Sequence, residues 1–259
     1  MPKLAANLST LFAELPFLER YEAAASCGFH LVECQFPYAV PADAIRDKLD
    51  RLGLAQVLIN APPGDAGRGE RGLAAVPGRQ ADFRAGIELA LRYAKRLGAP
   101  RVHVMAGLQT QGVPLADCLD VFVDNVAWAA DCFAESGIDV MLEPINTKVD
   151  VPGYVLHSTA DAVDCIRRVS RPNVKLQYDV YHMQIMEGDL ARSIEHLLPV
   201  IGHIQIADNP GRHEPGTGEI HFPWLLAQLD VLGYAGVVGC EYVPVGDTRE
   251  GLTWARPWL

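Results

Sequence analysis

Oxygen-bearing side chains recur at near-regular intervals in the second half of the sequence, each at the end of a short apolar run. They are Glu143, Asp179, Gln205 and Glu241, separated by 36, 26 and 36 residues. Three carboxylates brought together would repel one another unless a cation lay among them. Oxygen-rich sites suit Mg2+ or Mn2+, and they also accept Zn2+ or Co2+. The four residues therefore predict a divalent metal site, although strand-end carboxylates can also cap helices or pair with arginine.

Two of these residues, Glu143 and Glu241, could also move a proton. A divalent ion that binds a carbonyl oxygen and the adjacent hydroxyl makes the intervening C–H more acidic and stabilises an enediolate. One carboxylate can then remove a proton, and a second can return one to the neighbouring carbon. We therefore predict that Glu143 and Glu241 are at once metal ligands and the acid/base pair of an isomerase that acts on a small hydroxy-oxo acid.

Strands that alternate with amphipathic helices would bring these residues together. Helical spacing of apolar residues covers 83–97, 118–134 and 160–169. Between the helical stretches, eight apolar runs show little alternation, which is typical of strands covered on both faces. The runs are Lys3–Leu8, Leu31–Gln35, Ala55–Asn60, Arg101–Met105, Asp139–Glu143, Val174–Asp179, His203–Ala207 and Val237–Glu241.

Eight strand-then-helix units in 259 residues predict an α/β fold, a single (β/α)8 TIM barrel that spans residues 1–259 as one domain. An open doubly wound sheet is the alternative, but no G-x-G-x-x-G motif follows the first strand. The oxygen-bearing residues recur about once per unit of roughly 32 residues, the average for such a barrel. Their side chains should therefore converge at the carboxyl ends of the strands.

Two long polar connections, residues 61–78 and 209–218, follow strand ends on the same face of the predicted barrel. Ligands bind at this face in barrels of this kind. Arg71 and Arg212 lie in these connections, and each could bind a substrate carboxylate, because a guanidinium pairs with it through two hydrogen bonds. The alternative is that both are solvated arginines in flexible surface loops.

Several other polar residues end strands or follow them closely. His182 comes just after Asp179, and His103 lies near the end of the fourth strand, so both are candidates for substrate contacts. A surface histidine at a helix start and a buried core histidine are the respective alternatives. Asn7, Glu33 and Asn60 end early strands and could support the ligands from behind.

Composition narrows the classes of protein. The formal net charge is −10 and no basic run occurs, which argues against nucleic-acid binding. The six cysteines are scattered and form no C-x-x-C pair, as expected for reduced thiols in a cytoplasmic protein. No run of about 18 apolar residues predicts a membrane span, and the amino-terminal residues do not resemble a signal peptide. A homo-oligomer is compatible with the sequence.

The residues named so far stand in segments that resemble the hydroxypyruvate isomerase family, within the xylose-isomerase-like barrels. The resemblance runs nearly end to end. Its segments are residues 5–9 (AANLS), 69–74 (GERGLA), 77–79 (PGR), 143–146 (EPIN), 178–184 (YDVYHMQ), 203–210 (HIQIADNP), 214–220 (EPGTGEI) and 239–242 (GCEY). It implies catalytic glutamates at Glu143 and Glu241, and a divalent metal held by Glu143, Asp179, Gln205 and Glu241. It also implies interconversion of hydroxypyruvate and 2-hydroxy-3-oxopropanoate.

Other functions stay open on the sequence alone. A 2-oxotetronate isomerase is similar in the same segments, and the Pro144-Ile145-Asn146 that follows Glu143 favours hydroxypyruvate. In ketose 3-epimerases of the same fold the seventh strand supplies a His where this chain has Gln205. A phosphodiesterase of the endonuclease IV type would need more histidine ligands and a basic surface. A binding protein without catalysis would have no use for two opposed glutamates.

Overall fold

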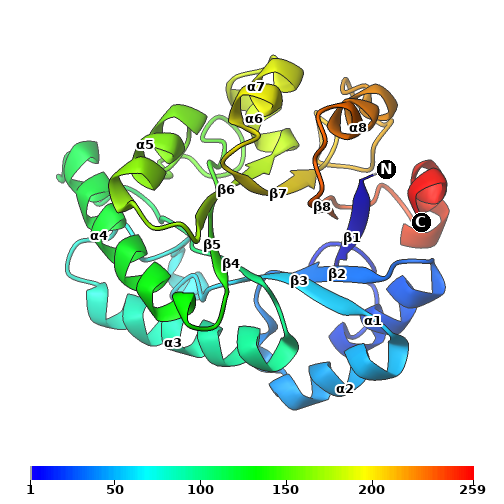
Figure 1. Cartoon of the computed structure of the whole chain (residues 1–259), viewed down its shortest axis with the longest axis horizontal. Helices are drawn as coiled ribbons and strands as arrows, with labels where there is room; N and C mark the ends of the chain where they lie inside the picture. The colour runs from blue at the N-terminus through cyan, green and yellow to red at the C-terminus, as the bar shows by residue number, and fades with distance from the viewer. Residues whose placement is uncertain (1) are drawn as a thin grey trace.

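Eight short strands pair in parallel, each with the next in sequence, and the eighth pairs with the first (Figure 1). The computed structural model describes residues 2–259, and within them the strands are β1 Lys3–Asn7, β2 Leu31–Cys34, β3 Ala55–Asn60, β4 Arg101–His103, β5 Asp139–Leu142, β6 Val174–Asp179, β7 Ile201–Ile206 and β8 Val237–Cys240. The strands are rich in apolar residues because helices cover them outside and side chains fill the barrel inside. The predicted (β/α)8 barrel is confirmed.

Helices surround the barrel on its outer side (Figure 1). They are α1 Phe17–Ser26, α2 Ala42–Leu52, α3 Gln80–Leu97, α4 Leu115–Ala134, α5 Thr159–Val169, α6 Val180–Met186, α7 Leu190–Leu197, α8 Phe222–Val231 and α9 Thr248–Gly251. Short 3-10 helices span Pro37–Ala39, Ala66–Arg68 and Leu252–Trp258. The three helices predicted from apolar spacing end where expected and begin one to three residues earlier. Among residues 2–259, none of the helices combines the length and apolar character that a membrane crossing requires.

The strand ends differ slightly from the prediction. β5 ends at Leu142 and β8 at Cys240, so Glu143 and Glu241 each stand one residue beyond their strand. β4 ends at His103 rather than at Met105, and β7 begins at Ile201, two residues before the predicted start. The two glutamates therefore stand where the chain leaves the strand ladder and enters the connections at the carboxyl ends of the strands.

Apolar side chains fill the lower part of the barrel lumen. Ala5, Val57, Met141 and Val237 pack in one cluster, although they come from strands that are mostly not neighbours. Such strands can meet only inside the barrel. Because residues two apart on a strand share a face, the positions that follow on the same strands also face the lumen. Asn7, Asn60 and Glu143 follow Ala5, Leu58 and Met141 of this cluster in that way, so these three strands carry polar side chains towards their carboxyl ends.

Candidate active site

A cavity of about 250 Å³ opens at the carboxyl ends of the strands. Six of the residues predicted from the sequence line it: Arg71, His103, Glu143, His182, Arg212 and Glu241. The other two, Asp179 and Gln205, lie beneath them and are fully buried. The convergence predicted from the spacing therefore holds, with four side chains from consecutive strands meeting at one end of the barrel.

Three buried carboxylates dominate the charge of the site. Burial raises the pKa of Glu143 well above its usual range, and the charges of Glu241 and Asp179 raise it further. Burial likewise raises the pKa of Glu241 to about 7, although the Arg212 guanidinium opposes the shift. Burial also raises the pKa of Asp179, again against the effect of Arg212. Keeping these three carboxyl groups buried and close together therefore costs free energy, and a further positive charge among them would lower that cost.

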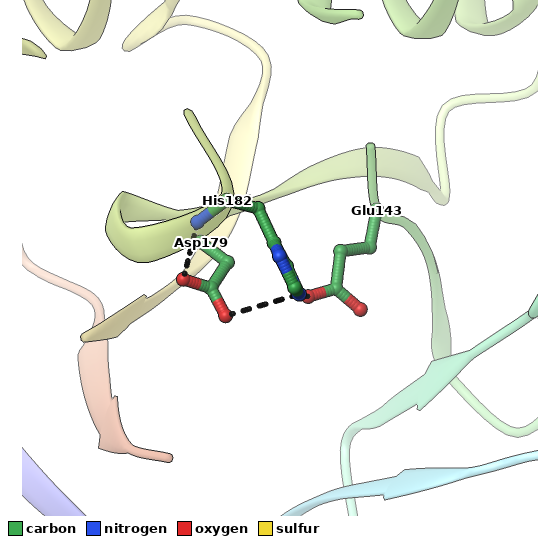
Figure 2. A group of neighbouring side chains, drawn as sticks. All are labelled: Glu143, Asp179 and His182. Carbon is green, nitrogen blue, oxygen red and sulfur yellow. Dashed lines mark hydrogen bonds and ion pairs between the residues drawn. The ribbon is translucent and has the colours of Figure 1, made fainter. Parts of the chain in front are cut away.

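A divalent cation fits this arrangement on three observations. Glu143, Asp179 and His182 each place one ligand atom within 4.8 Å of the others (Figure 2). Oε1 of Glu143 is buried and has no hydrogen-bond partner within the described residues 2–259. The donors around it are carboxylate and amide oxygens, which hard cations prefer. The local geometry therefore agrees with a metal site at these residues. That a metal binds there, and which metal it is, are still predictions.

His182 lies between the two carboxylates, as Figure 2 shows, with Nε2 3.8 Å from Asp179 Oδ2 and 3.9 Å from Glu143 Oε1. Its Nδ1 is 2.7 Å from Nδ2 of Asn146. The Asn146 oxygen accepts the backbone N–H groups of Val149 and Asp150, so the amide nitrogen must face the imidazole. Nδ1 of His182 is consequently the acceptor, and Nε2 carries the proton. With this tautomer Nε2–H can donate to an oxygen in the site, so of the three clustered residues the two carboxylates, Glu143 and Asp179, are the ones that can bind a cation.

His103 is buried at the cavity wall, and burial lowers its pKa to about 3, so the ring is neutral. Nδ1 lies 3.2 Å from Oε2 of Glu143, but the two groups are not aligned as a hydrogen bond. Neither ring nitrogen has a hydrogen-bond partner within residues 2–259. Buried polar atoms usually find one, so the ring is available to an oxygen of a bound substrate.

The two candidate arginines have different surroundings. Arg212 is held by carboxylates, at 2.7 Å from Glu241, 3.5 Å from Asp179 and 3.3 Å from Asp150. Arg71 is exposed, and its guanidinium donates to the backbone oxygen of Glu70 at 3.1 Å. Arg71 therefore presents more of its hydrogen-bonding capacity to the cavity than Arg212 does.

The two residues that flank Arg71 in the chain, Glu70 and Gly72, both make close contacts with other segments. Oε1 of Glu70 pairs with Arg79 at 2.5 Å. Gly72 has φ of +119°, and a Cβ there would overlap the Met105 carbonyl oxygen, so this close approach requires glycine. The long connection is thus anchored against the chain that follows β4 rather than loose over the barrel mouth.

Gln205 bridges two other polar side chains below the cavity. Its Nε2 donates to Oε1 of Glu33 at 2.8 Å, and its Oε1 accepts from Nε2 of Gln177 at 2.6 Å. An amide oxygen has two lone pairs, so one remains for a cation. Asn7 donates to both Glu33 and Glu241, each at 3.0 Å. The early strand-end residues Asn7 and Glu33 therefore contact the predicted ligands directly, as supporting groups should.

Four residues of the site were not assigned from the sequence: Gln35, Asn146, Asp150 and Gln177. Gln35 donates to Glu241 at 2.9 Å. Two of them could have been inferred from the sequence. Gln35 follows Glu33 by two positions and Gln177 precedes Asp179 by two, and residues two apart on a strand share a face. Asn146 and Asp150 lie in a connection, and no local pattern indicates that they would reach back to His182 and Arg212.

Comparison with known proteins agrees with this geometry. A family model described as xylose isomerase-like TIM barrel matches residues 21–258. A 2-oxo-tetronate isomerase of Cupriavidus necator is 49% identical over 100% of this chain and 99% of the relative. The hydroxypyruvate isomerase of Escherichia coli is 42% identical over 100% of both chains.

Solved structures agree on the fold. A Brucella melitensis protein described as an AP endonuclease of family 2 superposes with a TM-score of 0.97 at 48% identity, over 100% of this chain and 99% of the other. A 3-keto-D-glucoside 4-epimerase from E. coli, at 24% identity, has a TM-score of 0.80 over 99% of both chains and shares the fold. The chain therefore belongs to the hydroxypyruvate isomerase family of xylose isomerase-like TIM barrels, and it is an isomerase.

Proposed function

We propose that this isomerase interconverts hydroxypyruvate and 2-hydroxy-3-oxopropanoate by proton transfer between C2 and C3. The observation that carries the proposal is the pair of buried glutamates, Glu143 and Glu241, on one small cavity with the carboxyl pKa of each raised. A carboxyl group with a pKa nearer to neutrality can both take and give a proton at neutral pH. The family relationship supports the same reaction.

The proton balance of the reaction is simple. One glutamate carboxylate removes the proton from C3, which leaves an enediolate, and the other glutamate delivers a proton to C2. The hydroxyl proton moves from O3 to O2, so no oxidant or reductant is consumed. His182, through its Nε2–H, and His103 are placed to donate hydrogen bonds to the two substrate oxygens.

The residues that would hold a divalent metal, Mg2+ or Mn2+, are Glu143, Asp179, Gln205 and Glu241. When bound, such an ion would stabilise the negative charge on the substrate oxygens and make the neighbouring C–H more acidic. Arg71 is the side chain best placed to bind the substrate carboxylate, because Arg212 is already surrounded by three acidic residues.

The relatives' names support two substrates almost equally. The C. necator relative is named a 2-oxo-tetronate isomerase, and a human relative, 48% identical over 99% of this chain and 95% of its own, is named a putative hydroxypyruvate isomerase. The chemistry at C2 and C3 is the same, since 2-oxotetronate has one more carbon beyond C3. Comparing kcat/KM on the two acids decides between them, and a higher value on 2-oxotetronate would replace the three-carbon assignment.

The proton-transfer role is tested by Glu143→Gln and Glu241→Gln. Each variant should lower kcat by roughly 10²–10⁴-fold, because glutamine keeps the shape but cannot act as a base. Glu195→Gln, an exposed change on α7, is the matched control and should behave as wild type. Metal content is measured in the same samples. If saturating metal returned a glutamine variant to near wild-type turnover, that glutamate would be only a ligand.

Metal dependence is tested separately with Asp179→Asn. This change should weaken metal binding, and high Mg2+ or Mn2+ should restore part of the activity. Wild-type enzyme that is dialysed against a chelator should lose activity and recover it when metal returns. Full turnover in verified metal-free enzyme would contradict the metal assignment while leaving the two-glutamate mechanism open to its own test.

A further inference from the structure

We infer that Glu33 is a positioning residue that sets the orientation of the Gln205 side-chain amide, with the amide oxygen turned towards the site. The inference rests on the proposed metal site and assigns a function to a carboxylate that does not line the cavity. Glu33 stands on β2 and Gln205 on β7, far apart in the sequence and joined only through the barrel lumen.

Glu33 is fully buried, and three donors converge on its carboxylate. Nε2 of Gln205 and Nδ2 of Asn7 donate to Oε1 at 2.8 and 3.0 Å, and Nε2 of His203 contacts Oε2 at 2.7 Å. An ionised carboxylate only accepts hydrogen bonds, so the Gln205 group that faces it must be the amide nitrogen. The Gln205 oxygen is thereby turned away from Glu33.

The Gln205 oxygen faces Gln177, whose amide nitrogen donates to it at 2.6 Å. Gln205 is paired in register with Asp179 on the neighbouring strand, so its side chain lies beside a predicted ligand. The hydrogen bonds run in one direction from Gln177 through Gln205 to Glu33. Glu33 is the acceptor at the end of this series and defines that direction.

The two amides could otherwise reverse together. Oε1 of Gln177 is buried without a hydrogen-bond partner within residues 2–259, so nothing on its own side holds this amide in place. A turn of the terminal amide by half a rotation exchanges nitrogen for oxygen with little change of shape. Such a reversal would direct the Gln205 nitrogen, rather than its oxygen, at the predicted metal. A cation cannot be bound by an amide N–H.

The fold makes room for Glu33 at a specific place. A Cβ at Gly239 would overlap the carboxyl atoms of Glu33, so only glycine leaves space for the carboxylate there. Gly239 sits on β8, two residues before Glu241, where another lumen side chain would otherwise stand. The lack of a side chain at Gly239 is therefore a second observation, independent of the hydrogen bonds, that the fold accommodates the Glu33 carboxylate at this position.

The sharpest test is Glu33→Gln. The new glutamine offers one oxygen where the carboxylate offers two, so it cannot accept from Gln205, Asn7 and His203 as Glu33 does, and the Gln205 amide loses the carboxylate that fixes its direction. Mn2+ is titrated into chelator-treated protein, and free Mn2+ is counted by electron paramagnetic resonance. The Mn2+ dissociation constant should rise by roughly 10–100-fold, the usual effect of losing a group that orients a ligand.

Three further variants separate orientation from other effects. In a Gln205→Ala background, Glu33→Gln should cause no additional loss of Mn2+ affinity. The exchange variant Glu33→Gln with Gln205→Glu keeps the charge and the hydrogen bond, and should recover Mn2+ affinity to within about tenfold of wild type. Asn173→Ala, which removes two hydrogen bonds in the turn before β6, is a control for general destabilisation and should bind Mn2+ as wild type does.

An equal loss of affinity from Glu33→Gln with and without the Gln205 side chain would overturn the inference, since Glu33 would then act through its charge alone. Wild-type affinity in Glu33→Gln, when Gln205→Ala is weakened, would also overturn it. Failure of the wild-type protein itself to bind Mn2+ would be a different result. It would overturn the proposed metal site, and the positioning role of Glu33 with it.

Discussion

The raised pKa of Glu241 makes a measurable prediction about stability. Folding raises this pKa from its ordinary value of 4.5 to about 7, because the carboxyl group is buried. The folded protein therefore holds the proton more tightly than the unfolded chain does. Stability contributed by the protonated group is present at low pH and is lost as the pH rises from 4.5 through 7.

The size of the effect follows from the two pKa values. Between pH 5 and pH 8, a single group that titrates at 4.5 when unfolded and at about 7 when folded lowers the free energy of unfolding by roughly 2–3 kcal/mol. Glu241 is only 4% exposed, so solvent screening reduces this change in the free energy of unfolding only slightly. Glu241→Gln removes the titrating group while keeping its shape.

The assay is urea denaturation of chelator-treated wild type and Glu241→Gln at pH 5 and pH 8. The free energy of unfolding of wild type should fall relative to the variant by roughly 2–3 kcal/mol over this interval. Saturating Mg2+ at pH 8 should offset the fall in wild type, because a ligand that binds only the folded state stabilises it. Parallel pH profiles for the two metal-free proteins would refute the reasoning, since Glu241 would then not be strained by its surroundings.

Three further outcomes are expected. Isomerisation in D2O should place deuterium on C2 or C3 of the product, observed by NMR, and its complete absence after prolonged equilibration would indicate a hydride shift. Arg71→Met should lower kcat/KM by about 10–100-fold, the loss expected for a charge-assisted hydrogen bond to the substrate, whereas Arg68→Met in the same connection should not. Gly239→Ala should lower the free energy of unfolding by about 1–3 kcal/mol in urea denaturation, because its Cβ meets Glu33. Gly246→Ala, with open space around it, is the control for that change, and equal stability of the two variants would count against the packing argument.

The sequence by itself determined the barrel and the neighbourhood of the site. Short runs rich in Val, Ile and Leu that alternate with amphipathic helices specify strands buried on both faces, and eight such units leave few other folds. The carboxyl ends of parallel strands meet at one edge, so the spacing of Glu143 and Glu241 along the chain is enough to place them together. These features are local or periodic, and a pattern along the chain reveals them.

The tertiary structure alone decided which side chains meet across the lumen. Asn146 selects the tautomer of His182, Arg212 pairs with three carboxylates, and Glu33 reaches Gln205 on a strand on the other side of the lumen. Strand alternation tells which residues point inward, but the partner of each depends on strand tilt, register and the paths of the connections. Those quantities arise when the barrel closes, and hydrogen bonds that are sensitive to fractions of an ångström cannot be inferred from spacing in the sequence.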